Sequence, residues 1–251
     1  MTNWIWRGLR GGILATRYPF EAEAMPPRYR GGVQVLDGAA LEEYRRGEEA
    51  CLPRALTLEG WGARVDRGRC IQCGQCQRVA PNAYRMTPEF ELALVPDEVT
   101  AARERLRARV APLGRSVHLR HVDAGSDASC EQELQALFNP FYDLQRLGIF
   151  LTASPRHADV LVVTGVVTTA MADPLRLTFE AMPEPKIVMA VGTSACSGGI
   201  FAADGDVVGP VDRVLPVDVR VPGSPPAPLA IIHGLWVALG RATAHAREAV
   251  R

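Results

Sequence analysis

Three cysteines spaced two residues apart constrain this chain more than any other feature. They lie in the run Arg69-Cys70-Ile71-Gln72-Cys73-Gly74-Gln75-Cys76, where a glycine-containing loop presents three thiolates to one point. Soft sulfur ligands of this kind select iron–sulfur clusters. A structural zinc site prefers two separated C-x2-C knuckles and fits a continuous run poorly. A disulfide needs an oxidising compartment, and no signal peptide is visible. We therefore predict an iron–sulfur cluster, with zinc and a disulfide as the alternatives.

The run resembles that of bacterial-type ferredoxins, C-x2-C-x2-C-x3-C-P, with one difference. Ala80 stands where the fourth cysteine would be, although Pro81 is kept. In two-cluster ferredoxins the fourth cysteine of one run ligates the cluster of the other run. The cluster held by the three cysteines should therefore not need position 80. It should take its fourth thiolate from an earlier half of the domain.

That earlier half begins to be visible at Cys51, in a stretch that resembles the exit of a first ferredoxin run. Counting back from Cys51 by the spacing of the run places Leu41, Tyr44 and Gly47 where three cysteines would sit. One cluster site has thus lost all its ligands, and the other keeps all four. We predict a single [4Fe–4S] cluster. Cys51 alone could be an ordinary buried cysteine; its assignment depends on its register with the other three. The ligands of the predicted cluster are Cys51, Cys70, Cys73 and Cys76, and the residues of the lost site are Leu41, Tyr44, Gly47 and Ala80.

Composition and the first residues bear on partners. Lys plus Arg equals Asp plus Glu, 28 each, so charge gives no argument for nucleic acid. No apolar run reaches the ~18 residues of a membrane span. A helix near the N-terminus would place Ile5, Trp6, Leu9 and Ile13 on one face, which suits a membrane interface or a groove on a partner subunit. The alternative is a frayed helix docked on its own domain.

Four segments are expected. Residues 1–32 form an amphipathic helix and a proline-stiffened arm, residues 33–96 an α+β ferredoxin-like domain, and residues 97–115 a linker helix. Residues 116–251 form an α/β doubly wound domain of flavodoxin-like type, because apolar strands alternate with helices. Its strands are expected at 117–122, 160–165, 186–191 and 215–221. One helix is expected to follow the loop after the first strand and to end at Phe138, and others from Pro174 to Ala181 and from about Ala227 onward. Its chemistry should lie in the loops beyond the carboxyl ends of the strands.

Those loops read VDAGSDASCE, MPEPKIVMAVGTSACSGGIF and GPVDRVLPVDVRVPGSPPAP. From about Ser116 to Ala242 they closely resemble the small electron-transfer subunit shared by complex I, where it is called NuoB, and the membrane-bound [NiFe]-hydrogenases. The first half, with ATRYPF, resembles the ferredoxin subunit of the same complexes (NuoI or HycF), so the chain resembles a fusion of two neighbouring subunits. In that family the small subunit binds its own [4Fe–4S] cluster. The corresponding positions here are Asp127, Cys130, Ser194 and Ser224.

Only one of those four positions is a cysteine, although the glycines and the proline that shape the loops are present. Cys196 lies two residues from an expected position, so at most two thiolates are available. Aspartate and serine oxygens are hard ligands and replace thiolates on iron poorly. We expect this degenerate second site to hold no cluster, in which case Cys130 and Cys196 are small buried residues.

The resemblance implies an electron-transfer subunit of a membrane-associated complex-I-like or hydrogenase-like oxidoreductase. Its partners would be a large subunit (NuoD- or HycE-like) and a membrane arm, contacted through partners or the N-terminal helix. It would lie peripherally on the cytoplasmic side of the inner membrane. The alternative is a scaffold subunit without a continuous electron relay. A free-standing enzyme has little support, because no nucleophile–base pair or phosphate loop is present and the five histidines are scattered.

Overall fold

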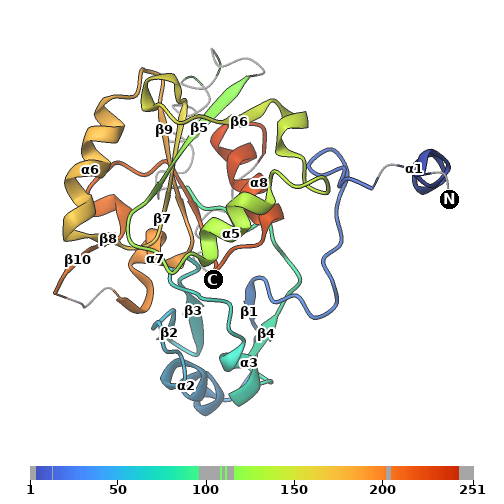
Figure 1. Ribbon diagram of the computed structural model, residues 1–251. Coiled ribbons are helices and arrows are strands. Elements are labelled where there is room, and N and C mark those ends of the chain that lie inside the picture. Colours follow the sequence, from blue (N-terminus) through green and yellow to red (C-terminus); the bar gives the residue numbers. More distant parts are fainter. Residues whose placement is uncertain are drawn as a thin grey trace.

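The computed structural model describes residues 4–12, 14–95, 108, 111, 116–201 and 205–242. A larger α/β unit is joined to a smaller unit built from residues 33–86, which lies at the bottom of Figure 1. The expected linker helix over 97–115 falls almost entirely outside the described residues.

A five-stranded parallel sheet is the centre of the larger unit. Its spatial order is β11-β9-β7-β5-β6, and every neighbouring pair is parallel. Numbered along the chain, this is the order 2-1-3-4-5 of flavodoxin-like doubly wound folds, so the predicted α/β class is confirmed. The strands are β5 (Val117–Asp123), β6 (Ile149–Leu151), β7 (Val160–Thr164), β9 (Ile187–Val191) and β11 (Val219–Val221).

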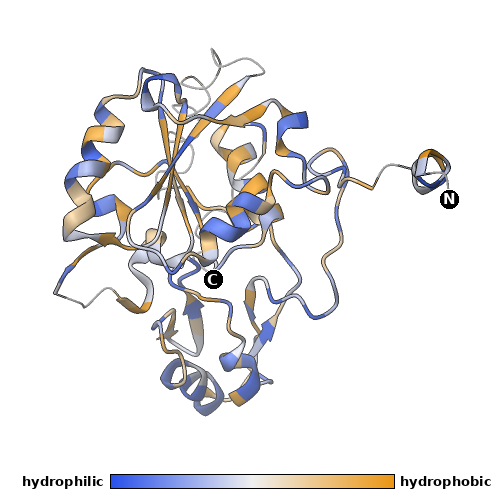
Figure 2. Ribbon diagram, viewed as in Figure 1, coloured by the Kyte–Doolittle hydropathy of each residue, from blue (hydrophilic) through white to orange (hydrophobic). Residues whose placement is uncertain are grey.

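Helices cover both faces of this sheet. Val160 and Val162 of β7 pack into one core with α5 (Ser129–Ala136) and α8 (Pro228–Ala238). Leu161 and Val163 point to the other core, with α6 (Thr169–Glu180) and α7 (Thr193–Ser197). Every residue of β7 and β9 is buried, which explains why these strands are apolar throughout rather than alternating. Figure 2 shows the same contrast between apolar strands and helices with polar outer faces.

Several expected boundaries differ in the structure. The helix expected from Pro174 begins at Thr169, so Pro174 lies inside α6 and removes one helical hydrogen bond instead of starting the helix. The strand expected over 215–221 is shorter, because only Val219–Val221 pairs with β9, and a 3-10 helix at Val211–Arg213 precedes it. Strand β6 was not predicted, since three residues give too short a pattern to recognise. The remaining elements are an antiparallel pair, β8 (Val167–Thr168) and β10 (Val207–Gly209), and short 3-10 helices at Leu144–Leu147, Pro155–His157 and Gly199–Phe201.

The smaller unit consists of two antiparallel strand pairs and two helices. Strand β1 (Val33–Val35) pairs with β4 (Tyr84–Met86), and β2 (Leu56–Glu59) forms a hairpin with β3 (Gly62–Val65). Helix α2 (Leu41–Glu49) follows β1, and α3 (Gln75–Val79) precedes β4. The chain therefore passes twice through two strands and a helix.

Two segments fasten the small unit to the large one. Leu94 exchanges two backbone hydrogen bonds of 2.8 Å with Arg220, so residues 93–95 add an antiparallel edge to β11. In the N-terminal arm, Tyr18 is buried, packs edge-on against Phe90 and donates a 2.8 Å hydrogen bond to Glu91. These contacts fix how the small unit meets the sheet.

Helix α1 (Trp4–Gly11) stands apart from both units in Figure 1. None of its residues is buried, and Trp4, Trp6 and Leu9 are largely exposed. The alternative in which this helix docks on its own domain is therefore wrong. Ile13, which was expected on the apolar face of the helix, lies outside the described residues. Among the residues that the structure describes, no helix has the length and apolar character needed to cross a membrane.

Candidate metal centre

A loop with two left-handed residues carries the cysteine run. Gln72 has φ +57° and Gly74 has φ +74°, and α3 begins immediately afterwards. The reversal between them leaves Cys73 exposed on the loop, whereas Cys76 is buried in the first turn of α3. A larger residue would fit poorly at position 74, because a Cβ there would lie 3.1 Å from Cδ of Arg30.

The four predicted ligands lie close enough to influence one another electrostatically. Burial, together with the sulfurs of Cys76, Cys51 and Cys73, raises the pKa of the Cys70 thiol to about 12. Burial also raises the pKa of Cys76, with Cys73 and Cys51 adding to the effect. The structure thus brings Cys51, at the end of α2, to the same place as the run that follows β3. A bound cationic metal group would favour loss of the thiol protons, so four thiols at one site suit such a group.

Backbone amides point at two of these sulfurs. The amide of Ala55 donates to Sγ of Cys51 at 3.2 Å, and the amide of Gln72 donates to Sγ of Cys70 at 3.4 Å. Such N–H···S contacts stabilise thiolate ligands and tune the potential of a bound cluster. All six cysteines of the chain are free thiols.

The described residues contain no group of three or more His, Cys, Asp or Glu that could hold a metal ion. A cubane cluster has four corners, each with its own thiolate, so its ligands surround a larger body than a single ion does. The donor set, four thiols and no oxygen or imidazole, fits an iron–sulfur cluster.

Three of the four positions of the predicted lost site lie in a packed core instead of a ligand shell. Tyr44 and Tyr84 are fully buried, and their rings meet edge-on with centroids 6.1 Å apart. The Tyr84 hydroxyl donates to the Tyr44 carbonyl at 2.9 Å, and the Tyr44 hydroxyl donates to the Leu36 carbonyl. A Cβ at Gly47 would lie 2.0 Å from the Tyr84 ring. Ala80 is fully buried beside them, whereas Leu41 is exposed.

A cavity of about 290 Å³ lies at the carboxyl ends of β5, β7, β9 and β11. It is lined by all four residues of the degenerate second site, Asp127, Cys130, Ser194 and Ser224. Cys196 does not line it; its buried Sγ lies 3.5 Å from the Ala190 carbonyl, inside the core. Burial raises the pKa of Cys130 to about 12, and hydrogen bonds from Ser129 lower the pKa of Asp127. One thiol, one carboxylate and two hydroxyls do not fit an iron–sulfur cluster.

The cysteine loop touches the rim of this cavity. Ile71, between Cys70 and Gln72, lines the cavity, and the Thr193 hydroxyl donates to the Cys70 carbonyl at 3.0 Å. The same hydroxyl accepts a hydrogen bond from the Gly223 amide at 3.2 Å. Sequence reasoning missed both Ile71 and Thr193. Thr193 is adjacent to Ser194, but nothing in the sequence says that its hydroxyl reaches another domain.

Of the five histidines, His245 lies outside the described residues. His233 is buried in α8 and accepts the Ala93 amide, and His121 bonds the Thr164 hydroxyl at 2.8 Å beside Glu131. Burial lowers the pKa of His121. None of the four described histidines lines the cavity or adjoins the cysteine loop.

Comparison with known proteins identifies the family of the α/β unit. The family model "NADH ubiquinone oxidoreductase, 20 Kd subunit" matches residues 128–238. The "probable membrane-bound hydrogenase subunit mbhJ" of Pyrococcus furiosus is 45% identical over 141 residues, which are 55% of this chain and 84% of that relative. The chain belongs to the 20 kDa subunit family. Formate hydrogenlyase subunit 7 of Escherichia coli is 44% identical over 126 residues, which are 50% of this chain and 49% of that relative.

The resemblance of the second half to NuoB and the hydrogenase small subunits is thereby confirmed. A second model, "4Fe-4S single cluster domain of Ferredoxin I", matches residues 65–113 of this 20 kDa family member. That stretch contains Cys70, Cys73 and Cys76, and Cys51 precedes it. A chain in the structure of the membrane-bound sulfane sulfur reductase, an archaeal respiratory membrane complex, is 28% identical with a TM-score of 0.44, covering 57% of this chain and 79% of that one.

Proposed function

We propose that this protein is the electron-transfer subunit of a complex-I-like or hydrogenase-like oxidoreductase and carries one [4Fe–4S] cluster. The cluster would be held by Cys51, Cys70, Cys73 and Cys76 in a ferredoxin-like unit. The observation that carries the proposal is the convergence of these four thiols from two segments of the chain. The match of residues 65–113 to a single-cluster 4Fe-4S domain supports it.

When bound, the cluster takes up and releases one electron at a time. The chain sets its surroundings: the Ala55 and Gln72 amides point at two ligand sulfurs and favour the more negative, reduced state. Arg30 donates to the Cys73 carbonyl and adds a positive charge at the exposed side of the loop. The buried Cys76 and the Tyr44–Tyr84 core exclude water from the opposite side.

We propose further that the chain combines two neighbouring subunits of such complexes and that two ancestral cluster sites carry no iron. One is the site at Leu41, Tyr44, Gly47 and Ala80, where the aromatic core of Tyr44 and Tyr84 occupies the space. The other is the cavity at Asp127, Cys130, Ser194 and Ser224, whose single thiol does not fit a cluster.

The donor set of that cavity favours a second candidate function, a scaffold subunit without a continuous relay. In this reading the α/β unit docks other subunits, and electrons do not pass through its cavity. The names of the relatives, subunits of membrane-bound hydrogenase and formate hydrogenlyase, support a place in a multisubunit complex. We propose a large NuoD- or HycE-like subunit as partner and peripheral attachment on the cytoplasmic side of the inner membrane. Exposed Trp4 and Trp6 of α1 would contact lipid or protein there.

The test is the iron and acid-labile sulfide content per chain, on protein purified without oxygen, with low-temperature EPR after reduction. We expect about four irons and one reduced-cluster signal, which Cys73→Ala abolishes. Cys130→Ala is the matched control and should leave iron and signal unchanged. About eight irons would mean that the second cavity is filled and the relay is continuous. Absence of iron would refute electron transfer and leave the scaffold.

A further inference from the structure

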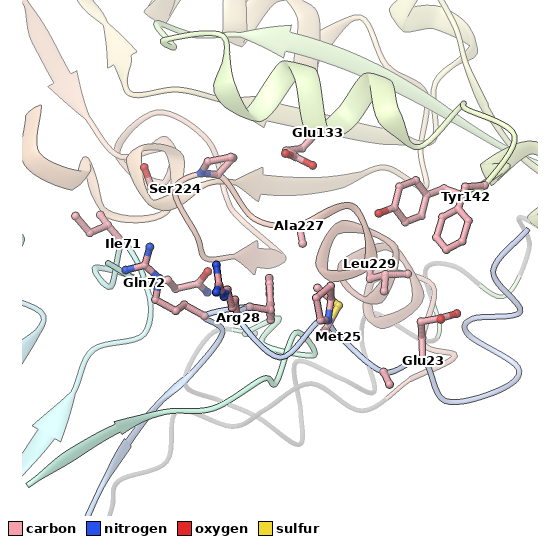
Figure 3. A pocket seen from close by; sticks show the side chains of 16 residues that line it. Glu23, Met25, Arg28, Ile71, Gln72, Glu133, Tyr142, Ser224, Ala227 and Leu229 are labelled. Carbon is pink, nitrogen blue, oxygen red and sulfur yellow. The ribbon is translucent and has the colours of Figure 1, made fainter. Parts of the chain in front are cut away.

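A second cavity, of about 620 Å³, lies between the N-terminal arm and the α/β unit. Figure 3 shows it bordered by the arm below, the cysteine loop at one end and the helices of the α/β unit above. Its volume falls within the roughly 300–1,000 Å³ of small-molecule sites. We call it the arm groove. The electron-transfer proposal gives it no role.

One end of the arm groove offers hydrogen-bond donors that the protein does not use. Arg28 is exposed, and its guanidinium makes no hydrogen bond or ion pair within the described part of the chain. The adjacent Tyr29 hydroxyl is buried without a hydrogen-bond partner among the same residues. Arg30 lines the groove as well and donates to the Cys73 carbonyl. A buried hydroxyl without a partner costs stability, which a bound acceptor would recover.

The rest of the wall is largely apolar. Met25 from the arm, Tyr142, and Leu229 at the start of α8 line it (Figure 3). Phe141 and Pro225 extend this surface. An occupant therefore needs an apolar body as well as a head that accepts hydrogen bonds.

Two acidic groups face the arm groove and restrict where an anion can bind. Glu23 accepts the Thr16 hydroxyl at 2.5 Å and lies past Met25, away from Arg28, in Figure 3. Burial raises the pKa of Glu133, whose charge also acts on the Tyr29 hydroxyl. Arg28 and Arg30 supply the positive charge of the groove, and Arg30 adjoins the cysteine loop. The fork of a guanidinium pairs with both oxygens of a planar carboxylate at once.

We propose that the arm groove binds a long-chain carboxylate, with its head on Arg28 and Tyr29 and its chain along Met25, Tyr142 and Leu229. The head then lies beside Arg30 and Gln72, which belong to or contact the cysteine loop. A negative charge there disfavours an added electron, so binding lowers the reduction potential of the cluster. The binding stands on the groove alone; this effect on the potential rests on the proposed function.

Titration calorimetry of the full chain with decanoate tests the binding. We expect saturable binding of one molecule per chain, weakened about tenfold or more in Arg28→Gln, as loss of a charge-assisted hydrogen bond predicts. Arg28→Lys keeps the charge without the fork and should be intermediate. Arg17→Gln is the matched control, because Arg17 is in the same arm but outside the groove, paired with Glu21 at 2.8 Å. It should bind as the unaltered chain does.

Equal affinity of Arg28→Gln, equal affinity for decan-1-ol, or absence of saturable binding would each overturn the proposal. If decanoate does not bind, and Met25 is protected from oxidation only when other subunits are present, the arm groove is a contact with a partner subunit and the proposal is overturned. Redox titration of the cluster is the second readout, and decanoate should lower its midpoint potential. An unchanged potential with intact binding refutes the coupling alone. A chain without iron refutes the proposed function and leaves the calorimetry decisive for the groove.

Discussion

Replacement of Gly47 by alanine tests whether the predicted lost cluster site is a filled core. Gly47 lies in α2, where alanine is normally the better residue by about 1 kcal/mol. Here its Cβ would lie 2.0 Å from Cε2 of Tyr84 and 2.8 Å from both Cδ2 and Cζ. Real Cβ atoms do not come this close, so the ring or the helix must move.

The Tyr84 ring has little freedom to move. It is fully buried, its hydroxyl is bonded to the Tyr44 carbonyl, and the Tyr44 ring meets it edge-on. Overpacking of a core costs about 1–3 kcal/mol, and such a constrained ring places the cost at the upper end. Subtracting the helical gain of alanine leaves a net loss of about 2 kcal/mol in the free energy of unfolding of the small unit.

Urea unfolding followed by the visible absorbance of the cluster reports on that unit, because the cysteine run lies in it. The expected result is a lower midpoint for Gly47→Ala with an unchanged slope. Gly62→Ala is the matched control in the same unit, since a Cβ on Gly62 meets nothing within 4 Å. Adding Tyr84→Leu should restore part of the lost stability, with a coupling energy of about 0.5–3 kcal/mol.

Gly47→Ala as stable as the unaltered chain would refute the packing argument. So would equal effects at Gly47 and Gly62, because only one of them faces the Tyr84 ring. Either result would mean that this site has room, and a lost cluster would then leave a void instead of an aromatic core.

Three further predictions concern the α/β unit. The folded state raises the pKa of Glu133 above its ordinary 4.5, so its ionisation costs stability as the pH rises through the raised value. Glu133→Gln should therefore be more stable than the unaltered chain at pH 7 in urea unfolding, and this advantage should vanish below pH 4.5; the same advantage at both pH values would contradict the argument. Leu94→Pro removes the N–H that donates to the Arg220 carbonyl, so it should lower the free energy of unfolding by about 1–3 kcal/mol. Proteolysis between the two units should become faster. Unchanged proteolysis would mean that this edge contact does not hold the units together. Gly223 has φ +136°, and a Cβ there would lie 2.7 Å from the backbone of Pro226. Gly223→Ala should therefore lower the free energy of unfolding by about 1–3 kcal/mol, measured by thermal unfolding. Gly205→Ala is the control and should leave stability unchanged, because a Cβ at Gly205 meets nothing within 4 Å.

Much of the α/β fold was predictable because its signals are local. Val160–Thr164 and Ile187–Val191 are apolar without alternation, which only strands buried on both faces require. The smaller unit was predicted only as an α+β ferredoxin-like domain over residues 33–96, without its strand pairing. Strand β6 and the edge contact of Leu94 escaped prediction, because a few residues carry no readable period and their pairing depends on distant partners.

The candidate site divides in the same way. The spacing of Cys70, Cys73 and Cys76 determined the class of metal group from sequence alone, because three soft ligands on one short loop need no tertiary information. The role of Cys51 and the lost site at Leu41, Tyr44, Gly47 and Ala80 were hypotheses from register, and both stay predictions. The packing of Tyr44 and Gly47 against Tyr84 was not predicted. Whether these residues approach one another depends on how α2 packs against α3 and β4.

The sequence by itself thus determined the donor chemistry of the cysteine loop, the parallel strands and the turns that end them. Only the tertiary structure decided that Cys196 points into the core and not into the cavity that Cys130 and Ser194 line. The same holds for the bond from Thr193 to the Cys70 carbonyl and for the groove beneath the arm. The physical reason is range. Ligand softness, burial pattern and turn chemistry act within a few residues, whereas contacts between segments more than a hundred residues apart arise only when the two units pack.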